Sequence, residues 1–491
     1  MFMNMICAML TRLKVSGFKN LKNVDVQFGP FTCIAGLNGV GKSNLFDAIH
    51  FFALLSNHSL MEAAAFVRDD AGRSDSVRNL FSYSALGQTE LMKLEAEMII
   101  PKAALDDLNQ QANATTTFVR YELHLRWVGD SSDGLGPIRI EREILQHLLS
   151  KEHTKHLPFP HDKKRWRDQV VKMGRRTVPY ISTSQSNDGV VINRHQDGGS
   201  KGKPQPILAH SLPRTILSRA NADESPTALC ARREMESWRM LQLEPSSLRQ
   251  PDNFNSPTYL SPNGGHLPAT ISRIIEDSGE EHGVEIQQIT NRLRELVPDV
   301  RRMRIEKNER LERLTLYVEL ADGSEHAARS LSDGTLRFLA LVVLEADPIF
   351  TGVLCFEEPE NGIHPQRINT IIELLQDIAT DPDEFADITN PLRQVIINTH
   401  APEVVKIIPD SSLLVAKSVV ISVKDTYETQ VRFGFLSDTW RSSNQEQTRD
   451  VLNIANVSVY LNPPQNDDAG DARRVIDRQD AQEYLPLTYS K

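Results

Sequence analysis

The sequence predicts an α/β protein built around a parallel sheet, and three observations carry this prediction. A glycine-rich loop follows an apolar, β-rich stretch and precedes a stretch with helical periodicity. Two further β-rich stretches, far along the chain, end in polar residues, as strands do where a parallel sheet forms a ligand site. Segments of alternating apolar and polar residues add antiparallel hairpins.

Amino-acid composition limits the classes of protein to which the chain can belong. The chain has 491 residues, 40% hydrophobic and 24% charged, as expected of a globular protein with about two to four domains. Its net charge of −10 means that any nucleic-acid contact must come from a local patch. The cysteines lack C-x-x-C pairing, which argues against zinc ribbons and disulfides and fits a reducing cytoplasm. No apolar run approaches the ~20 residues of a membrane span. We interpret residues 1–8 as a dispensable extension, because regular structure is expected from Met9 onward.

A phosphate-binding pattern occupies residues 36–43. Gly36, Gly41, Lys42 and Ser43 satisfy G-x-x-x-x-G-K-[ST]. In this pattern glycines turn backbone N–H groups onto phosphate oxygens, the lysine reaches the β- and γ-phosphates, and the serine hydroxyl binds Mg²⁺. The flanking sequences provide the strand and the helix that this pattern requires, since "FTCIAG" is β-rich and "NLFDAIHFFALL" places its apolar residues on one helical face. The positive end of that helix then faces the phosphates.

Three later segments place polar groups at the ends of apolar elements. The strand "VLCF" ends in Glu357 and Glu358, which suit a Mg²⁺ ligand and a base for an attacking water; a solvated acidic turn is the alternative. Ser332 and Gly334 precede a long apolar helix, whose N-terminus is a second anion site. The strand "QVIINT" ends before His400, for which a capping or packing role is the alternative.

The order of these elements resembles that of the ATP-binding-cassette (ABC) ATPases, specifically the soluble RecF/SMC-like branch with the old-type and AAA-21 ATPases. The stretches "LTRLKVSGFKNLKNVDVQFGPFTCIAGLNGVGKSNLFDAI" and "EEPENGIHP" carry the resemblance, and residues 243–271 are similar to the lobe before the signature helix. The resemblance covers residues 9–145 and 234–420. It implies an ABC-type ATPase head, in which a P-loop parallel sheet with helices joins an antiparallel β lobe, with a helical or loop insertion.

The resemblance also implies a role for each matching residue. ATP is expected to contact Lys19, Asn20, Asn38, Gly39, Gly41, Lys42, Ser43 and Asn44, and, from the other subunit, Ser332 and Gly334. Mg²⁺ is expected at Ser43 and Glu357, with Glu358 as catalytic base and His400 as switch histidine. The contact from the other subunit implies a homodimer or a higher even-numbered homo-oligomer. Two positions depart from the family pattern, because Glu357 replaces the usual Asp and Asp333 replaces a glycine of the signature. Gln88 is a candidate for the glutamine loop, although a turn before a strand is the favoured interpretation.

The remaining sequence suggests a division into lobes. We expect an N-terminal lobe at 9–145, an insertion at 146–233, a C-terminal lobe at 234–435 and a partner-docking tail at 436–491. Alternation predicts two hairpins, in "FVRYELHLRW" with "GPIRIEREIL" and in "RLTLYVELADGSEHAA".

The insertion is unusually basic. Residues 151–176 hold nine Lys or Arg against three acids, and with Trp166 they suit a DNA or RNA backbone; a solvated basic face is the alternative. Its histidines lack a cysteine or acidic partner at zinc spacing. Residues 181–205 are expected to form a flexible loop, and Ser225 and Pro226 to begin a helix.

The sequence offers no second chemistry beyond the ATPase motifs. It shows neither an internal repeat nor a Toprim nuclease pattern after His400, so we interpret the chain as a motor or sensor that acts on a separate effector. It resembles the ATPase subunits of Septu- and retron-type anti-phage systems, which control a separate nuclease. The alternatives are a RecF-like DNA-repair or chromosome-maintenance ATPase that clamps DNA, and a stand-alone regulatory NTPase.

Overall fold

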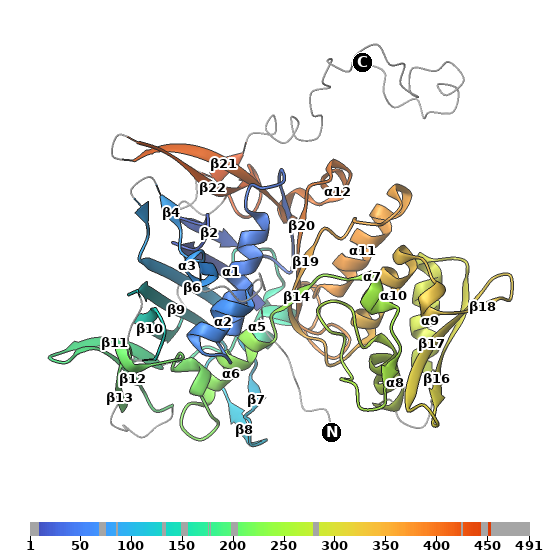
Figure 1. Cartoon of the computed structure of the whole chain (residues 1–491), viewed down its shortest axis with the longest axis horizontal. Coiled ribbons are helices and arrows are strands. Elements are labelled where there is room, and N and C mark those ends of the chain that lie inside the picture. Colours follow the sequence, from blue (N-terminus) through green and yellow to red (C-terminus); the bar gives the residue numbers. More distant parts are fainter. Residues whose placement is uncertain are drawn as a thin grey trace, which may run out of the picture.

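Two lobes lie side by side in the structure, a computed structural model (Figure 1). The described residues are 9–67, 75–84, 87–129, 134–148, 156–174, 176, 178–197, 205–277, 284–423, 426–442 and 450–452. The expected extension 1–8 and residues 453–491 of the expected tail lie outside them. Helix α1 (Lys42–Leu54) belongs to the left-hand lobe and α10 (Asp333–Ala346) to the right-hand lobe. Within the described ranges, no helix has the length and apolar character needed to cross a membrane.

A seven-stranded sheet forms the centre of the molecule. Its strands, in spatial order, are β14 (Arg239–Leu241), β19 (Gly352–Glu357), β20 (Arg393–Thr399), β3 (Phe31–Ala35), β21 (Leu413–Val423), β22 (Thr426–Leu436) and β23 (Val451–Leu452). The first five are parallel. Since β20 lies between β3 and β19, the carboxyl ends of the three strands that carry the predicted motifs meet at one edge of the sheet. The predicted parallel sheet is confirmed.

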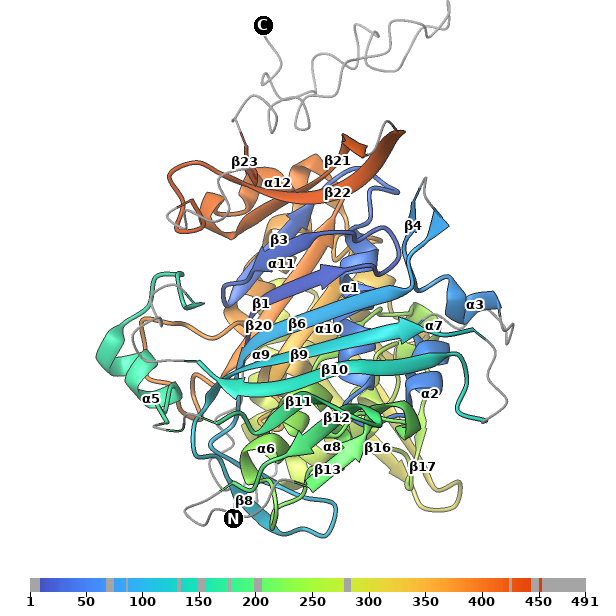
Figure 2. The same ribbon diagram turned by 90° about the vertical axis from the view of Figure 1, so that its left-hand side faces the viewer.

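An eight-stranded antiparallel sheet makes up most of the left-hand lobe (Figure 2). Its strands, in spatial order, are β13 (Gln205–Leu208), β12 (Gly189–Arg194), β11 (Ile181–Ser186), β10 (Ile138–His147), β9 (Phe118–Trp127), β6 (Leu91–Ile99), β1 (Met9–Ser16) and β2 (Val24–Gln27). The first predicted hairpin is confirmed as β9–β10, and β1 begins at Met9 as expected.

The parallel sheet is a wall shared by two hydrophobic cores. Ile34 and Ile396 face the core that α1 and the antiparallel sheet complete, whereas their neighbours Cys33 and Ile397 face the core of the right-hand lobe. Successive residues of a strand point to opposite faces, so each of these strands must be apolar on both sides. This explains why their sequences are nearly continuous apolar runs.

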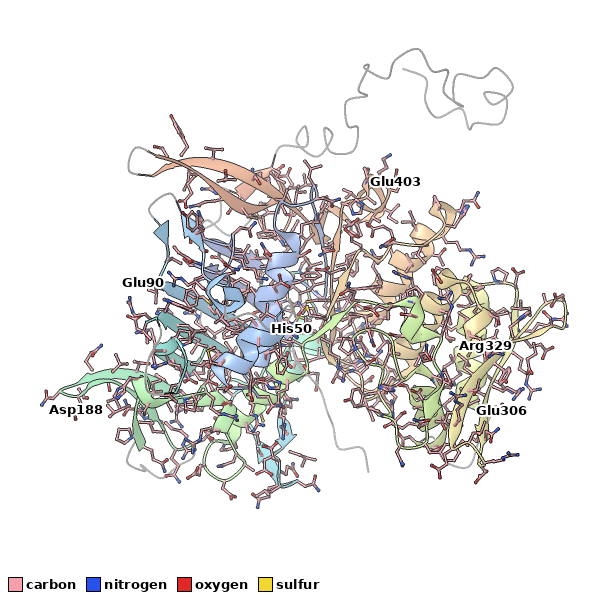
Figure 3. The ribbon with its side chains drawn as sticks, in the orientation of Figure 1. His50, Glu90, Asp188, Glu306, Arg329 and Glu403 are labelled. Atoms are coloured by element: carbon pink, nitrogen blue, oxygen red, sulfur yellow. The ribbon has the colours of Figure 1, made fainter. Side chains whose placement is uncertain are left out.

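Part of the insertion belongs to the antiparallel sheet, which corrects the loop expected at 181–205. Strands β11 and β12 form a hairpin that pairs Ser184 with Val191, and β13 continues the sheet. The tip, marked by Asp188 in Figure 3, precedes Gly189 with a φ of 118°. Ser186 pairs with Gly189, so Asn187 and Asp188 form the two-residue turn. Asn and Asp are typical turn residues, but the polar residues around them concealed this signal.

A buried carboxyl group anchors the next part of the insertion to the sheet. Glu143 of β10 accepts hydrogen bonds from the backbone N–H groups of Ile216 (2.9 Å) and Leu217 (2.8 Å). Burial raises the pKa of Glu143 to about 7.

The predicted helix follows as α6 (Pro226–Glu236), which begins with its proline, although the Ser225 side chain makes no capping hydrogen bond.

The right-hand lobe combines a small sheet with helices. The strands are β15 (Asp252–Asn253), β16 (Val300–Asn308), β17 (Arg313–Leu320) and β18 (Glu325–Ala327), and the helices are α7 (Pro245–Leu248), α8 (Leu267–Asp277), α9 (Val284–Leu296), α10 and α11 (Ile368–Ile378). The second predicted hairpin is confirmed as β17–β18, with Gly323 at a φ of 83° in its turn. Shorter elements are α2 (Leu60–Phe66), α3 (Asp75–Arg78), α5 (Asp168–Val170), α12 (Pro402–Ile407), β4 (Tyr83–Ser84), β5 (Gly87–Gln88), β7 (Ala103–Leu105) and β8 (Gln111–Asn113).

Candidate nucleotide-binding site

The glycine-rich loop joins β3 to α1 and closes around its own lysine. The buried Lys42 donates hydrogen bonds from Nζ to the carbonyl oxygens of Gly36 (2.7 Å) and Leu37 (3.0 Å). Gly41 has a φ of 120°, and a Cβ there would lie 2.4 Å from Nδ2 of Asn20. Only glycine satisfies both the backbone conformation and this close approach.

Lys42 is electrostatically linked to the end of β19. Burial lowers the pKa of Lys42, and the charges of Glu358, Glu360 and Glu357 act in the opposite direction. The three carboxylates therefore favour the charged ammonium that a phosphate requires. This arrangement brings together two segments some 300 residues apart in the sequence.

Lys19 and Asn20 support the loop from the side. Nζ of Lys19 donates to Oδ2 of Asp47 (2.8 Å). Asn20 donates to the carbonyl oxygen of Val40 (3.0 Å) and accepts from Nδ2 of Asn44 (2.8 Å). These bonds tie the segment after β1 to both the loop and α1.

A cavity of about 570 Å³ adjoins this support. Its lining residues are Lys19, Asn20, Lys22, Asn79, Phe81, Tyr83, Gln88 and Thr429. Tyr83 is 73% exposed there, and Gln88 accepts a hydrogen bond from Nε of Arg78 (2.8 Å). The cavity therefore combines aromatic and polar groups beside the phosphate loop, which suits a nucleoside. The role of Gln88 as a glutamine loop stays a prediction.

One asparagine organises the two acids at the end of β19. Oδ1 of Asn398 accepts a hydrogen bond from the backbone N–H of Glu358 (3.1 Å), and its Nδ2 donates to Oε1 of Glu357 (3.4 Å). Glu358 has a φ of 47°, a conformation that non-glycine residues adopt rarely and often at functional sites. Asn398 was not among the predicted site residues, although it lies in the strand "QVIINT".

His400 lies beside the proposed base. Its Nδ1 is 2.9 Å from Oε1 of Glu358, and both side chains are partly exposed. The preceding Thr399 donates from Oγ1 to Oε1 of Glu360 (2.5 Å). Burial raises the pKa of Glu360, which was also not among the predicted site residues. A histidine in contact with a carboxylate can orient that carboxylate and share a proton with it.

The signature residues lie in the other lobe. Oγ of Ser332 accepts a hydrogen bond from the N–H of Thr335 (3.2 Å) and so caps α10, while Ser332 and Asp333 are exposed. A Cβ on Gly334 would lie 3.7 Å from the Ile363 side chain. Arg249 forms a salt bridge with Asp333. This unpredicted partner offsets the negative charge that Asp333 brings to the signature.

The oxygen donors fit a Mg²⁺ ion that is shared with a nucleotide. Among the residues that the structure describes, no group of three or more His, Cys, Asp or Glu side chains could hold a metal alone. Protein-bound Mg²⁺ usually takes one or two carboxylates and completes its shell with waters and phosphate oxygens. Glu357 supplies one such carboxylate, and Ser43, in the first turn of α1, supplies a hydroxyl oxygen as a further ligand.

The basic segment of the insertion differs from its expected form. Trp166 is fully buried and packs against Phe159, with ring centroids 5.6 Å apart. Its side chain is therefore not available for the nucleic-acid contact in which we had included it. Lys163, Lys164 and Arg165 are exposed, so the phosphate contact of this segment stays a prediction.

Two protein-family models match the chain. Residues 236–406 match AAA_21, described as "AAA domain, putative AbiEii toxin, Type IV TA system", and residues 12–113 match AAA_23, described as "AAA domain". The chain carries AAA-type ATPase domains. The first match includes Ser332, Glu357, Glu358 and His400, and the second includes the glycine-rich loop.

Curated relatives match shorter segments. The DNA replication and repair protein RecF of Paenarthrobacter aurescens is 38% identical over 60 residues, or 12% of this chain and 15% of the relative. RecF of Lactobacillus acidophilus is 48% identical over 50 residues, or 10% of this chain and 13% of the relative. The matches thus span less than a sixth of these relatives.

Solved structures of Smc head domains align over most of this chain. The Pyrococcus furiosus Smc head, bound to the C-terminal domain of ScpA, covers 86% of this chain and 96% of its own, with 11% identity and a TM-score of 0.42. The Thermotoga maritima SMC head covers 86% of this chain and 97% of its own, with 11% identity and a TM-score of 0.35.

Proposed function

We propose that this chain is a Mg²⁺-dependent ATPase that converts ATP and water to ADP and phosphate. The convergence of Lys42 with Glu357 and Glu358 at the carboxyl edge of one parallel sheet carries this proposal. The neighbouring cavity beside Lys19 and Asn20 supports it, because it offers room for a nucleoside next to the phosphate loop.

Each group has a task that follows from its position. Backbone N–H groups of the loop and Nζ of Lys42 bind the phosphates, while Ser43 and Glu357 hold Mg²⁺. The bound ion supplies positive charge that neutralises the phosphate oxygens. Glu358 orients the attacking water and accepts its proton, and His400 holds the Glu358 carboxylate in place. Most of the rate gain then comes from positioning and charge stabilisation.

The active unit in this proposal is a homodimer or a higher even-numbered homo-oligomer. Ser332 and Gly334 face the nucleotide held by the partner subunit. The exposure of Ser332 and Asp333 on the surface of the right-hand lobe supports this arrangement, because an N-terminus of a long helix is a ready anion site.

The proposed biological role is that of a sensor or regulator in a bacterial anti-phage complex with a separate nuclease. The family description over residues 236–406, which names a toxin of a toxin–antitoxin system, supports this role. The second candidate is a RecF-like ATPase that clamps DNA, which the short matches to RecF proteins favour.

Phosphate release from Mg-ATP by the purified full chain tests the ATPase proposal, with EDTA as the control. We expect hydrolysis that EDTA abolishes; no release under any nucleotide or protein concentration would contradict it. The same preparation should cut neither DNA nor RNA with Mg²⁺ or Mn²⁺. Co-purification with a nuclease encoded by a neighbouring gene supports the defence role, whereas DNA binding that increases with ATP, without such a partner, favours the RecF-like role.

A further inference from the structure

A second cleft, remote from the glycine-rich loop in the sequence, opens between α8, α9 and β16. Its volume is about 640 Å³. The apolar lining residues are Ile275, Ile286, Met303 and Ile305. The charged ones are Arg294, Arg301, Arg302, Arg304, Lys307 and Glu276. Five basic side chains against a single acid make this cleft strongly positive, although the chain as a whole carries a net charge of −10.

The cleft runs along the edge of a strand rather than over its face. Consecutive residues from Arg301 to Ile305 line it, whereas a strand that offered only one face would contribute every second residue. β17 pairs with one side of β16, and β15 and β18 both pair with β17. β16 is therefore an edge strand among the described elements, with backbone N–H and C=O groups directed into the cleft.

Side chains divide this edge into a closed and an open part. Arg294 donates to the carbonyl oxygens of Val300 (3.2 Å) and Arg301 (2.5 Å), which closes the beginning of the edge. Residues 302–308 follow as the open part. Glu306, labelled in Figure 3, marks this strand in the right-hand lobe.

Three of the five basic side chains form no salt bridge among the described residues, and one of these three, Arg294, is already bonded to backbone carbonyl oxygens. Arg304 pairs with Glu325 (2.7 Å) and Lys307 with Glu276 (2.5 Å). Arg301 and Arg302 are exposed, and neither forms a salt bridge within the described part of the chain. Exposed positive charge protects an open strand edge against segments that are neutral or positive, but it attracts a segment of opposite charge.

We propose that this cleft binds an extended acidic segment of a partner protein, which adds to β16 as a further strand. In strand addition, main-chain hydrogen bonds give affinity and pockets for alternate side chains give specificity. Acidic side chains of the segment would face Arg301 and Arg302, and its alternate apolar side chains would cover Ile305, which is only partly buried. A nucleic acid matches the charge, but it lacks peptide N–H and C=O groups for the edge and leaves the apolar floor uncovered. The proposal goes beyond the ATPase and does not depend on it.

The cleft also lies next to the signature helix. α9 forms one wall of the cleft, and Arg292 of α9 pairs with Glu345 of α10 (3.0 Å). A segment bound at β16 would therefore contact the helix that packs against α10.

Fluorescence anisotropy with the full chain tests this proposal. The probe is a labelled peptide of alternating glutamate and valine. The comparison probes are an alternating lysine–valine peptide, the glutamate–valine peptide with prolines in place of its central valines, and a single-stranded DNA of equal charge. We expect only the first probe to bind, with weaker binding at high salt. Hydrogen exchange should show new protection of backbone amides in residues 302–308.

Paired variants locate the site. Arg301→Glu with Arg302→Glu should weaken binding of the acidic peptide at least about tenfold, because like charges would then meet. Asn291→Trp, which fills the cleft from α9 without a change of charge, should also weaken it. Arg310→Glu with Arg313→Glu reverses two exposed charges elsewhere on the same hairpin and should leave affinity unchanged, with unfolding temperature as the check on folding.

Three results would overturn the proposal. Equal binding of the proline-containing peptide would show attraction by charge without strand addition. Preferred binding of the DNA probe, lost in the Arg301→Glu and Arg302→Glu variant, would make the cleft a phosphate-backbone site. Binding of the acidic peptide that neither cleft variant affects would place it elsewhere on the molecule.

Discussion

The two lobes present their expected functional residues in opposite ways. In the left-hand lobe, Lys42 and Asn20 are fixed by hydrogen bonds to the loop that they serve. In the right-hand lobe, Ser332 is exposed, and its hydroxyl bonds to the backbone N–H and the hydroxyl of Thr335 in the first turn of its own helix. One lobe is thus a preformed pocket, and the other offers a surface whose ligand must come from outside its own core. The comparison suggests a site divided between two subunits.

Lys42→Ala should have the largest effect, since it removes the buried cation of the preformed pocket. We expect ATP binding to weaken at least about 100-fold, because charge-assisted hydrogen bonds to phosphate are lost. Equilibrium binding of a fluorescent ATP analogue measures this loss. The exposed Lys93 provides the control: Lys93→Ala should bind like the unmodified chain, and similar weakening in both variants would contradict the role of Lys42.

Glu358→Gln should separate binding from chemistry in the same lobe. The variant keeps the size of the side chain but loses the base, so hydrolysis should slow about 100-fold while ATP binding persists. Phosphate release and nucleotide binding are measured on one preparation. Glu403→Gln, which changes an exposed acid on α12, should hydrolyse ATP normally. Unchanged turnover in Glu358→Gln would remove Glu358 from the role of base.

Mixing two inactive variants tests whether the lobes of different subunits cooperate. Lys42→Ala chains lack the pocket and Ser332→Arg chains lack the signature surface, so a mixed dimer retains one intact site. Because a mixed dimer has one intact site where the unmodified dimer has two, we expect its ATPase activity to return to at most about half that of the unmodified dimer. Mass measurement shows whether mixed dimers form. If they form and stay inactive, the divided site is ruled out.

A matched pair of capping serines gives the smallest expected effect. Ser59 caps α2 with a reciprocal bond to Glu62, and Ser332 caps α10. Ser59→Ala and Ser332→Ala should each lower the free energy of unfolding by about 1 kcal/mol. Chemical denaturation measures this change. Only Ser332→Ala should also reduce hydrolysis, and equal activity in the two variants would leave Ser332 as a structural cap.

Local patterns were sufficient for most of the fold. The glycine-rich loop, the strands beside it and both predicted hairpins depend on neighbouring residues, so their periodicity and turn residues predicted them. The order of motifs also indicated which strand ends would meet. The strand pair β11–β12 was missed because its Asn187–Asp188 turn lies among polar residues that are typical of loops.

The sequence by itself determined which groups can bind phosphate and Mg²⁺, because glycine, lysine and carboxylate chemistry is a property of residue type. The tertiary structure alone decided how these groups are supported. It placed Asn398 between two acids, gave Asp333 the partner Arg249 and buried Trp166, which we had included in a predicted contact with a DNA or RNA backbone. The pairings of Asn398 and of Asp333 join segments 40 or more residues apart, and only the packing of strands and helices brings such segments within hydrogen-bonding distance.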